Sequence, residues 1–181
     1  MKIYKSHFKI AFFMLTVLVF ACKNTETKKG FAWEDCKFGK PEPIFGENNL
    51  PGIKTKTFAI TKAEGLEVVN FSDSLKTELS IRQSGCDELQ QEFTFTYTGR
   101  GFADWSDEQW KKQAAMEFIK FSRMSTRLYP YNNWAQAVFE QHDSIRIGEI
   151  RELAPGHSLK INKLSQSEQG QMIVTLLGKR E

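Results

Sequence analysis

An alternation of apolar and polar side chains over residues 54–98 restricts the fold of this chain more than any other feature. Residues 75–82 alternate strictly, and in residues 93–98 three aromatic residues alternate with threonines. This period of two predicts half-buried β-strands, and β-branched and aromatic content predicts two more at 57–61 and 66–71. Turn-forming residues separate the four segments, at 63–65, 72–74 and 84–88. Because short connections join antiparallel neighbours, we expect a four-stranded meander with one wet face.

A helical period replaces this alternation from residue 106 onwards. Ser106 and Gln109 have the spacing of a capping box, and Trp105 and Trp110 occupy the two positions of a hydrophobic staple. An apolar stripe then recurs at intervals of three and four residues until Pro130 prevents its continuation. The pattern predicts an amphipathic helix that covers the meander.

The remainder of the chain predicts a second helix and a return to strands. The helix begins at about Asn133, with four residues on or near one face: Trp134, Val138, Phe139 and His142. Ile145 and Ile147 indicate an extended stretch, and two closing strands are predicted at 159–161 and 172–176, around a turn at 165–170. The fold class is therefore α+β: an antiparallel meander sheet, two helices packed on one face, and a closing strand pair. No internal repeat divides residues 31–181, which we interpret as a single domain.

The N-terminus has the organisation of a secretion signal. Lys2, Lys5 and Lys9 precede an apolar run from Ile10 to Phe20, which is followed by Ala21. Since a helix needs about 20 apolar residues to span a bilayer, this run is too short for a stable span and suits the core of a signal peptide. We predict that residues 1–21 are a cleaved signal peptide.

The residues at the cleavage position, Val19, Phe20, Ala21 and Cys22, resemble the lipobox of bacterial lipoproteins. The resemblance covers the leader alone. It implies that Cys22 receives a diacylglycerol on its thiol and an acyl chain, such as palmitate, on its amine, which together anchor the chain stably. Residues 22–30 would then be a polar tether, and the protein would be lipid-anchored in the cell envelope, at an inner or outer membrane and a leaflet that the sequence leaves open. The alternative is a soluble secreted protein cut after Ala21.

Net charge argues against a general nucleic-acid binder. The chain holds 25 Lys and Arg against 22 Asp and Glu, and removal of Lys2, Lys5 and Lys9 with the leader leaves 22 of each. A neutral chain gains nothing from phosphate neutralisation and counterion release. We therefore expect partners other than nucleic acid.

Two cysteines, Cys36 and Cys86, remain in the folded part once Cys22 is assigned to lipid. Because thiols outside the cytoplasm tend to be oxidised, we predict a disulfide that pins the irregular segment 31–51 against the sheet. The alternative is two unpaired buried thiols. A metal site that combines them with His142 and His157 is disfavoured because no pair has ligand spacing such as C-x2-C. We assign no metal and no cofactor.

Catalytic patterns are sparse in the mature sequence. His142 and His157 are its two histidines, and no GxSxG, HExxH or P-loop pattern occurs. The Gly99–Gly101 segment could cradle an anion through backbone amides, but a GxG between a strand and a helix favours a tight turn. The acidic pairs Asp87/Glu88 and Asp107/Glu108 suit a turn and a helix start. We therefore assign no catalytic residue.

Aromatic residues between the two predicted helices are the remaining signal. Tyr129, Tyr131, Asn132 and Trp134 form a candidate binding surface, since Trp and Tyr are enriched in binding hot spots. We expect a non-catalytic, membrane-anchored envelope lipoprotein that binds a partner protein or an envelope ligand, as an inhibitor, an immunity factor or an assembly component. The alternatives are a small envelope hydrolase that uses His142 or His157, and a purely structural lipoprotein.

Overall fold

The computed structural model describes residues 33–61, 64–99, 101–166 and 168–179. The predictions made for the signal peptide, for Cys22 and for the tether lie outside these residues. Within the described ranges, no helix has the length and apolar character that crossing a membrane requires.

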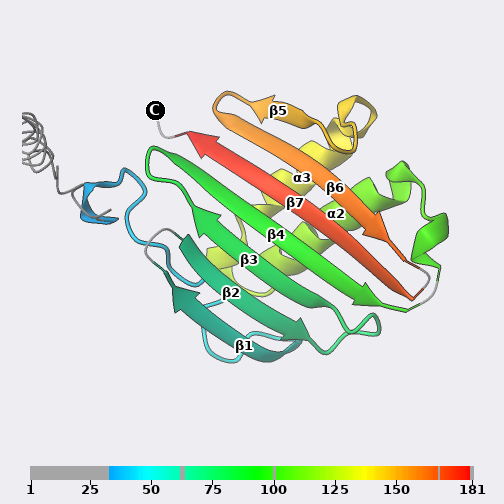
Figure 1. Cartoon of the computed structure of the whole chain (residues 1–181), viewed down its shortest axis with the longest axis horizontal. Helices are drawn as coiled ribbons and strands as arrows, with labels where there is room; N and C mark the ends of the chain where they lie inside the picture. The colour runs from blue at the N-terminus through cyan, green and yellow to red at the C-terminus, as the bar shows by residue number, and fades with distance from the viewer. Residues whose placement is uncertain (1–32, 62–63, 100, 167, 180–181) are drawn as a thin grey trace, which may run out of the picture. The chain divides into compact units, whose positions relative to one another are not determined.

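A seven-stranded antiparallel sheet forms one layer of the domain (Figure 1). Its strands are β1 (Ile53–Ile60), β2 (Glu64–Phe71), β3 (Glu78–Ser84), β4 (Glu88–Thr98), β5 (Ile150–Ala154), β6 (His157–Ser165) and β7 (Gln169–Lys179). The spatial order is β1-β2-β3-β4-β7-β6-β5, so the first four strands are the predicted meander and β7 closes against β4. The predicted α+β fold is confirmed. The structure contains one further strand, the short β5, which pairs with β6 and forms an edge of the sheet.

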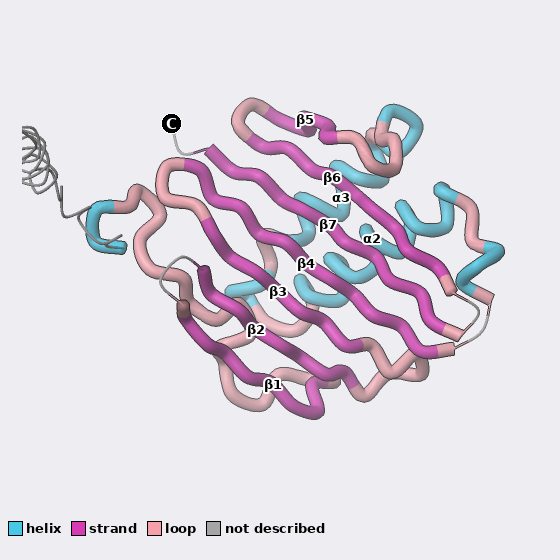
Figure 2. The backbone as a smooth tube through the Cα atoms, in the orientation of Figure 1, coloured by secondary structure: helices cyan, strands magenta, loops and turns pink. Residues whose placement is uncertain are grey.

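Two helices, α2 (Asp107–Ser122) and α3 (Tyr131–Glu140), lie together on one face of this sheet. Figure 2 shows both behind the strands, and no element of the described chain covers the opposite face. The described residues also contain four short 3-10 turns: η1 (Trp33–Asp35), η2 (Phe102–Asp104), η3 (Thr126–Leu128) and η4 (His142–Ser144). The prediction that the helices pack on one face is confirmed.

Alternate residues of the central strands make the core beneath the helices. Phe93, Phe95 and Tyr97 of β4 are 0% exposed, as the alternation predicts. The ring of Phe121 on α2 lies 6.2 Å from that of Phe93 and 5.8 Å from that of Phe95, between ring centroids. Aromatic rings therefore join the sheet to the helix layer, and their burial stabilises this interface.

The start of α2 confirms the capping box. The Ser106 hydroxyl accepts the backbone N–H of Gln109, and the Gln109 side chain accepts the backbone N–H of Ser106. The rings of Trp105 and Trp110 lie 5.0 Å apart, as a staple requires. The helix is shorter than the predicted apolar stripe. It ends at Ser122, whose hydroxyl donates to the Ile119 carbonyl, and the stripe continues beyond it.

The start of β3 differs from the alternation in the sequence. Residues 75–77 precede the strand, and Lys76 has a φ of 48°, a left-handed conformation that a continuous strand excludes. The carboxylate of Asp73 accepts the backbone N–H of Thr77 at 2.9 Å and so stabilises this turn. The alternation extends across the turn because Thr77 is buried although it lies outside the strand.

The predicted second helix also differs in detail. It begins at Tyr131, directly after Pro130, and it ends at Glu140, so His142 lies in η4 beyond it. Val138 is buried as expected, whereas Phe139 is 42% exposed, because consecutive helical residues cannot share one face. Ile145 is buried in the connection that precedes β5.

Residues 36–47, which we call the strap, lie irregularly against the helix side of the sheet. The carboxylate of Glu67 accepts the backbone N–H of Ile44 at 2.7 Å and that of Phe45 at 3.0 Å. The ammonium of Lys56 donates to the carbonyls of Phe45 and Glu47. Side chains of β1 and β2 therefore provide hydrogen-bond partners for backbone N–H and carbonyl groups of the strap, which has no strand partner of its own.

Candidate functional site

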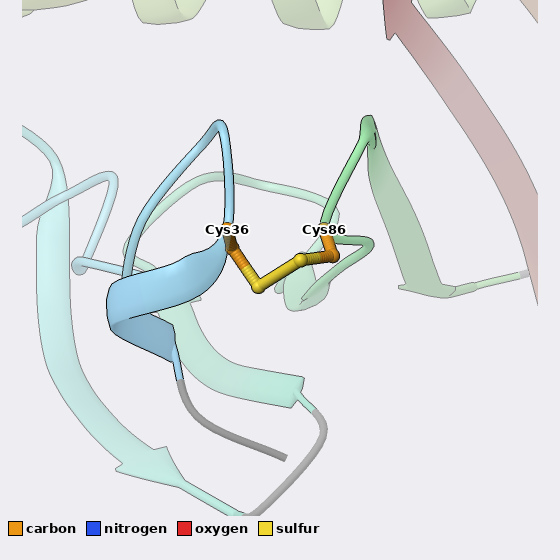
Figure 3. The surroundings of a disulfide bond; sticks show 2 residues. All are labelled: Cys36 and Cys86. Carbon is orange, nitrogen blue, oxygen red and sulfur yellow. A yellow bond between two sulfur atoms is a disulfide. The ribbon is translucent and has the colours of Figure 1, made fainter.

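A disulfide between Cys36 and Cys86 ties the strap to the turn that joins β3 and β4 (Figure 3). The two Cα atoms are 4.5 Å apart, and the bond confirms the predicted pairing. The turn itself depends on Gly85, whose φ is 101° and where an added Cβ would lie 1.8 Å from the Glu88 carbonyl oxygen. The disulfide and the glycine together fix one wall of the cavity described next.

Two adjoining cavities, of about 500 and 560 Å³, lie beside the strap. They share Phe38, Leu89 and Gln91, so we treat them as two lobes of one strap groove. Each lobe falls in the size range of ordinary ligand pockets. The lining residues come from η1, the strap, the β3–β4 hairpin, η3, α3 and the adjacent ends of β6 and β7: Trp33, Phe38, Gly39, Lys40, Pro41, Glu42, Ile44, Gln83, Ser84, Gly85, Leu89, Gln91, Arg127, Leu128, Tyr131, Trp134, His157, Leu176, Gly178 and Lys179.

A row of hydrogen bonds crosses the first lobe of this groove. Gln83 and Gln91 are directly opposed on β3 and β4, and the Gln91 amide donates to the Gln83 carbonyl oxygen at 3.5 Å. The Gln83 amide in turn donates to the Glu42 backbone carbonyl at 2.6 Å, and the Tyr131 hydroxyl donates to the Gln91 carbonyl oxygen at 3.4 Å. The two glutamines therefore connect the strap to α3.

The structure divides the predicted aromatic surface. Tyr131 and Trp134 both line the strap groove, one in each lobe. The Tyr131 ring packs against Phe118 with centroids 5.7 Å apart, and burial raises the pKa of its hydroxyl. Tyr129 is 61% exposed, and neither it nor Asn132 lines the groove. Two of the four predicted residues therefore line the strap groove, in different lobes.

Charges around the groove are largely paired. Arg127 of η3 lies 3.5 Å from the Glu42 carboxylate and donates to the Pro43 carbonyl. Lys179 lies 2.8 Å from the Glu88 carboxylate, whose hydrogen bond raises the pKa of Lys179. The lining thus carries little uncompensated charge, apart from exposed Lys40 at its rim.

The two histidines lie in different environments. His157 lines the second lobe, with its Nδ1 atom 2.9 Å from the Pro155 carbonyl and its ring 5.9 Å from that of Trp134. His142 lines a separate cavity of about 280 Å³ beside α2. Its Nδ1 atom lies 2.9 Å from the Phe139 carbonyl and its Nε2 atom 3.2 Å from the Asp143 carboxylate. The structure therefore does not bring the two histidines into one site.

Other candidate patterns have structural explanations. Cys36 and Cys86 are bonded to each other, so neither offers a thiolate to a metal. Among the described residues, no group of three or more His, Cys, Asp or Glu could hold a metal ion. The backbone N–H of Gly99 donates to the Glu168 carbonyl at 3.0 Å, so it is not free to receive an anion. Asp107 and Glu108 occupy the first turn of α2, where the negative charge of carboxylates interacts favourably with the helix dipole.

A buried polar cluster joins α2 to the far end of β4. The Tyr97 hydroxyl donates to the Glu117 carboxylate at 3.3 Å, and Gln113 donates to the same oxygen at 2.8 Å. Lys120 lies 3.6 Å from Glu117 and 2.8 Å from Asp73. Burial raises the pKa of Glu117 and that of Tyr97. Because none of these side chains lines the strap groove, we interpret the cluster as structural.

Sequence reasoning missed the glutamines that cross the groove. Gln83 continues the inward-facing positions of Leu79 and Ile81, and Gln91 continues those of Phe93. A polar side chain in such a position is the signal that could have indicated them, since a buried amide needs partners.

Comparisons with known proteins add no residue to this description. No family model matches the chain, and neither a curated protein nor a solved structure matches it. The candidate site is therefore defined by geometry alone.

Proposed function

We propose that the protein is a lipoprotein of the cell envelope, anchored to a membrane through Cys22, that binds a partner protein or an envelope ligand without transforming it chemically. The single observation that carries the binding role is the strap groove, a two-lobed cavity with aromatic and amide side chains. Pockets of this size, mostly apolar with a few convergent polar groups, are the usual form of ligand sites.

The disulfide supports the extracytoplasmic part of this proposal. Disulfides such as Cys36–Cys86 persist in oxidising compartments and are rare in the cytosol. The lipobox-like residues before Cys22 support the anchor, because they resemble the signal for lipidation of this cysteine. The 11 residues from Cys22 to Trp33 (33 − 22) extend at most about 40 Å, so the groove would lie close to the membrane surface. Anchoring raises the effective concentration of the groove near surface-bound partners.

The surroundings of the histidines favour binding over hydrolysis. A Ser–His or Cys–His mechanism needs a nucleophile within hydrogen-bond reach of the imidazole. The polar contacts of His142 are with a carbonyl and with Asp143, and the hydrogen bond of His157 is with a carbonyl. Neither contact pattern, within the described part of the chain, includes a hydroxyl or a thiol.

Metabolic labelling tests the anchor. We expect radiolabelled palmitate to be incorporated into the full-length protein expressed in a lipoprotein-processing bacterium, and we expect none in the Cys22→Ala variant. An unlabelled wild-type protein with an uncut leader would contradict the anchor.

Crosslinking in intact cells tests the binding role. We expect a reproducible crosslinked species with wild-type protein that is lost in Trp134→Ala, which alters the groove. Tyr129→Ala is the matched control, because it removes an aromatic residue that is 61% exposed and outside the groove. Equal capture by both variants would exclude the groove as the binding site. Loss of nothing but stability in Trp134→Ala would favour the purely structural lipoprotein.

A double variant tests the rival hydrolase. We expect His142→Gln together with His157→Gln to leave the crosslinked species and any cellular phenotype unchanged. Loss of the phenotype with the fold intact would favour the hydrolase instead.

A further inference from the structure

The paired glutamines of the strap groove retain unused hydrogen-bonding capacity. A side-chain amide carries two N–H donors and a carbonyl oxygen with two lone pairs. Gln83 uses one N–H on the Glu42 carbonyl, and Gln91 uses one on Gln83 at the long distance of 3.5 Å. Each amide thus keeps a further N–H beside the cavity. Hydroxyl groups, which both donate and accept, match this mixture of donors and acceptors.

Aromatic side chains accompany the amides in both lobes. Tyr131 lines the first lobe, Trp134 the second, and Phe38 lies where the lobes meet. The faces of such rings pack well against the C–H faces of sugar rings, since these are apolar while their edges carry hydroxyls. Two lobes joined at Phe38 suit a ligand of more than one ring.

The charges of the groove argue against an anionic ligand. The guanidinium of Arg127 and the ammonium of Lys179 already contact Glu42 and Glu88, at 3.5 and 2.8 Å. An anion would have to compete with these carboxylates. Lys40 is exposed at the rim, where a solvated charge contributes little.

The sheet topology argues against an extended peptide. Peptides that add a strand to a sheet bind at a free edge, through main-chain hydrogen bonds. The edges here are β1 and β5, and neither lines the groove. The groove lies over interior strands, where Gln91 is already opposed to Gln83 on one side and to Leu176 on the other. Recognition in the groove must therefore come from side chains.

We infer that the strap groove binds a neutral oligosaccharide, with Gln83 and Gln91 bonding to ring hydroxyls and the aromatic side chains packing against ring faces. This inference rests on the proposed function, because it takes the groove to be the ligand site. The other ligand classes, an extended peptide and an ionised molecule, become outcomes of the test below.

The test is a titration of the full-length protein in detergent with cellotetraose, maltotetraose, chitotetraose and neutral polysaccharide from the expressing cell's own envelope. Saturation-transfer NMR detects contact, and calorimetry gives the affinity. We expect binding of at least one probe, weakened about tenfold or more by Gln91→Leu and by Trp134→Ala. Gln91→Leu keeps the side-chain volume while it removes the amide. Tyr129→Ala should bind like the wild type, and a cooperative urea transition with a folded baseline under the binding conditions should confirm that each variant folds.

The outcomes separate this inference from the proposed function. Binding of none of the probes, while Trp134-dependent crosslinking in cells persists, would overturn the saccharide and keep the groove as a site for a peptide or an ionised ligand. Saccharide binding that Gln91→Leu and Trp134→Ala leave unchanged would place the sugar elsewhere and overturn the inference. Absence of both saccharide binding and Trp134-dependent crosslinking would remove both proposals.

Discussion

The carboxylate of Glu67 on β2 accepts the backbone N–H of Ile44 at 2.7 Å, and so holds the strap to a strand that is 23 residues away in sequence. The same carboxylate accepts the N–H of Phe45 at 3.0 Å. Glu67→Gln leaves one carbonyl oxygen for two N–H groups and turns an NH2 group toward one of them. We expect a loss of about 1.5–3 kcal/mol in the free energy of unfolding, measured by urea denaturation. Glu78→Gln, an exposed change on β3, is the control and should be near neutral. An equal loss of stability in Glu67→Gln and Glu78→Gln would contradict the role of Glu67 in holding the strap.

Glu117 makes the stability of the domain depend on pH. Burial raises its pKa above the ordinary 4.5, against the attraction of Lys120. The folded chain therefore keeps a proton that the unfolded chain has released, and this contribution to stability falls as pH rises through the folded-state pKa. Glu117→Gln removes the titration, so the variant should gain stability relative to the wild type as pH rises above the ordinary value of 4.5. Urea denaturation at a series of pH values measures the difference.

Asp73 is a control for that experiment, because its contribution to stability has the opposite dependence on pH. Although burial opposes it, hydrogen bonds from Lys120 and Thr77 lower the pKa of Asp73. Its contribution is present above the unfolded-state pKa and is lost as pH falls through the folded-state pKa. Asp73→Asn should therefore lose stability relative to the wild type as pH rises toward the ordinary value of 3.8, so the urea series for this variant is extended below pH 4. The same slope in Asp73→Asn and Glu117→Gln would contradict the assignment of the two environments.

The disulfide should be a large contributor to stability. Cys36 and Cys86 close a loop of 50 residues, which removes about 4 kcal/mol of loop entropy from the unfolded chain in the chain-entropy description. We expect Cys36→Ser with Cys86→Ser to lower the free energy of unfolding by an amount of this order, in urea under non-reducing conditions. Free thiols at both positions in wild-type protein from the envelope would contradict the bond.

The N-terminus of α2 offers a smaller and more local effect. Ser106→Ala removes the hydroxyl that accepts the Gln109 N–H, and we expect a loss of about 1 kcal/mol. Ser106→Asp keeps an acceptor at the cap and should stay close to the wild type. Urea denaturation of both variants decides between capping and a general effect of the substitution.

The fold was largely predictable from the sequence because its signals are local. Alternation around Phe93 and Phe95 and the cap at Ser106 each depend on neighbours a few residues away. The boundaries were less predictable. The turn at Lys76 interrupts an alternation that continues through Thr77, and α2 ends at Ser122 although Leu128 still packs in the core. At both places a residue is buried although it lies outside the strand or helix. The sequence pattern therefore predicted which residues are buried better than it predicted where each element ends.

The groove was only half predictable because it is assembled from distant segments. Tyr131 and Trp134 could be predicted from the sequence because Tyr and Trp are enriched in binding sites. Phe38 and Gln91 lie more than 50 residues apart, and nothing local states that the strap brings one beside the other. The predicted pairing of Cys36 with Cys86 indicated that segment 31–51 lies against the sheet, but it did not indicate the space enclosed beside the disulfide.

The disulfide also determines how the domain responds to mechanical tension. Cys36 is the fourth described residue of the chain, and its bond leads directly to Cys86. A pull on the N-terminus is therefore transmitted through the sulfur atoms to the hairpin between β3 and β4, and it bypasses residues 37–85. Under the proposed anchoring through Cys22, tension would be carried mainly by the disulfide and less by the backbone of the strap, β1 and β2, so the part of the groove that the strap lines would keep its shape until the domain yields elsewhere.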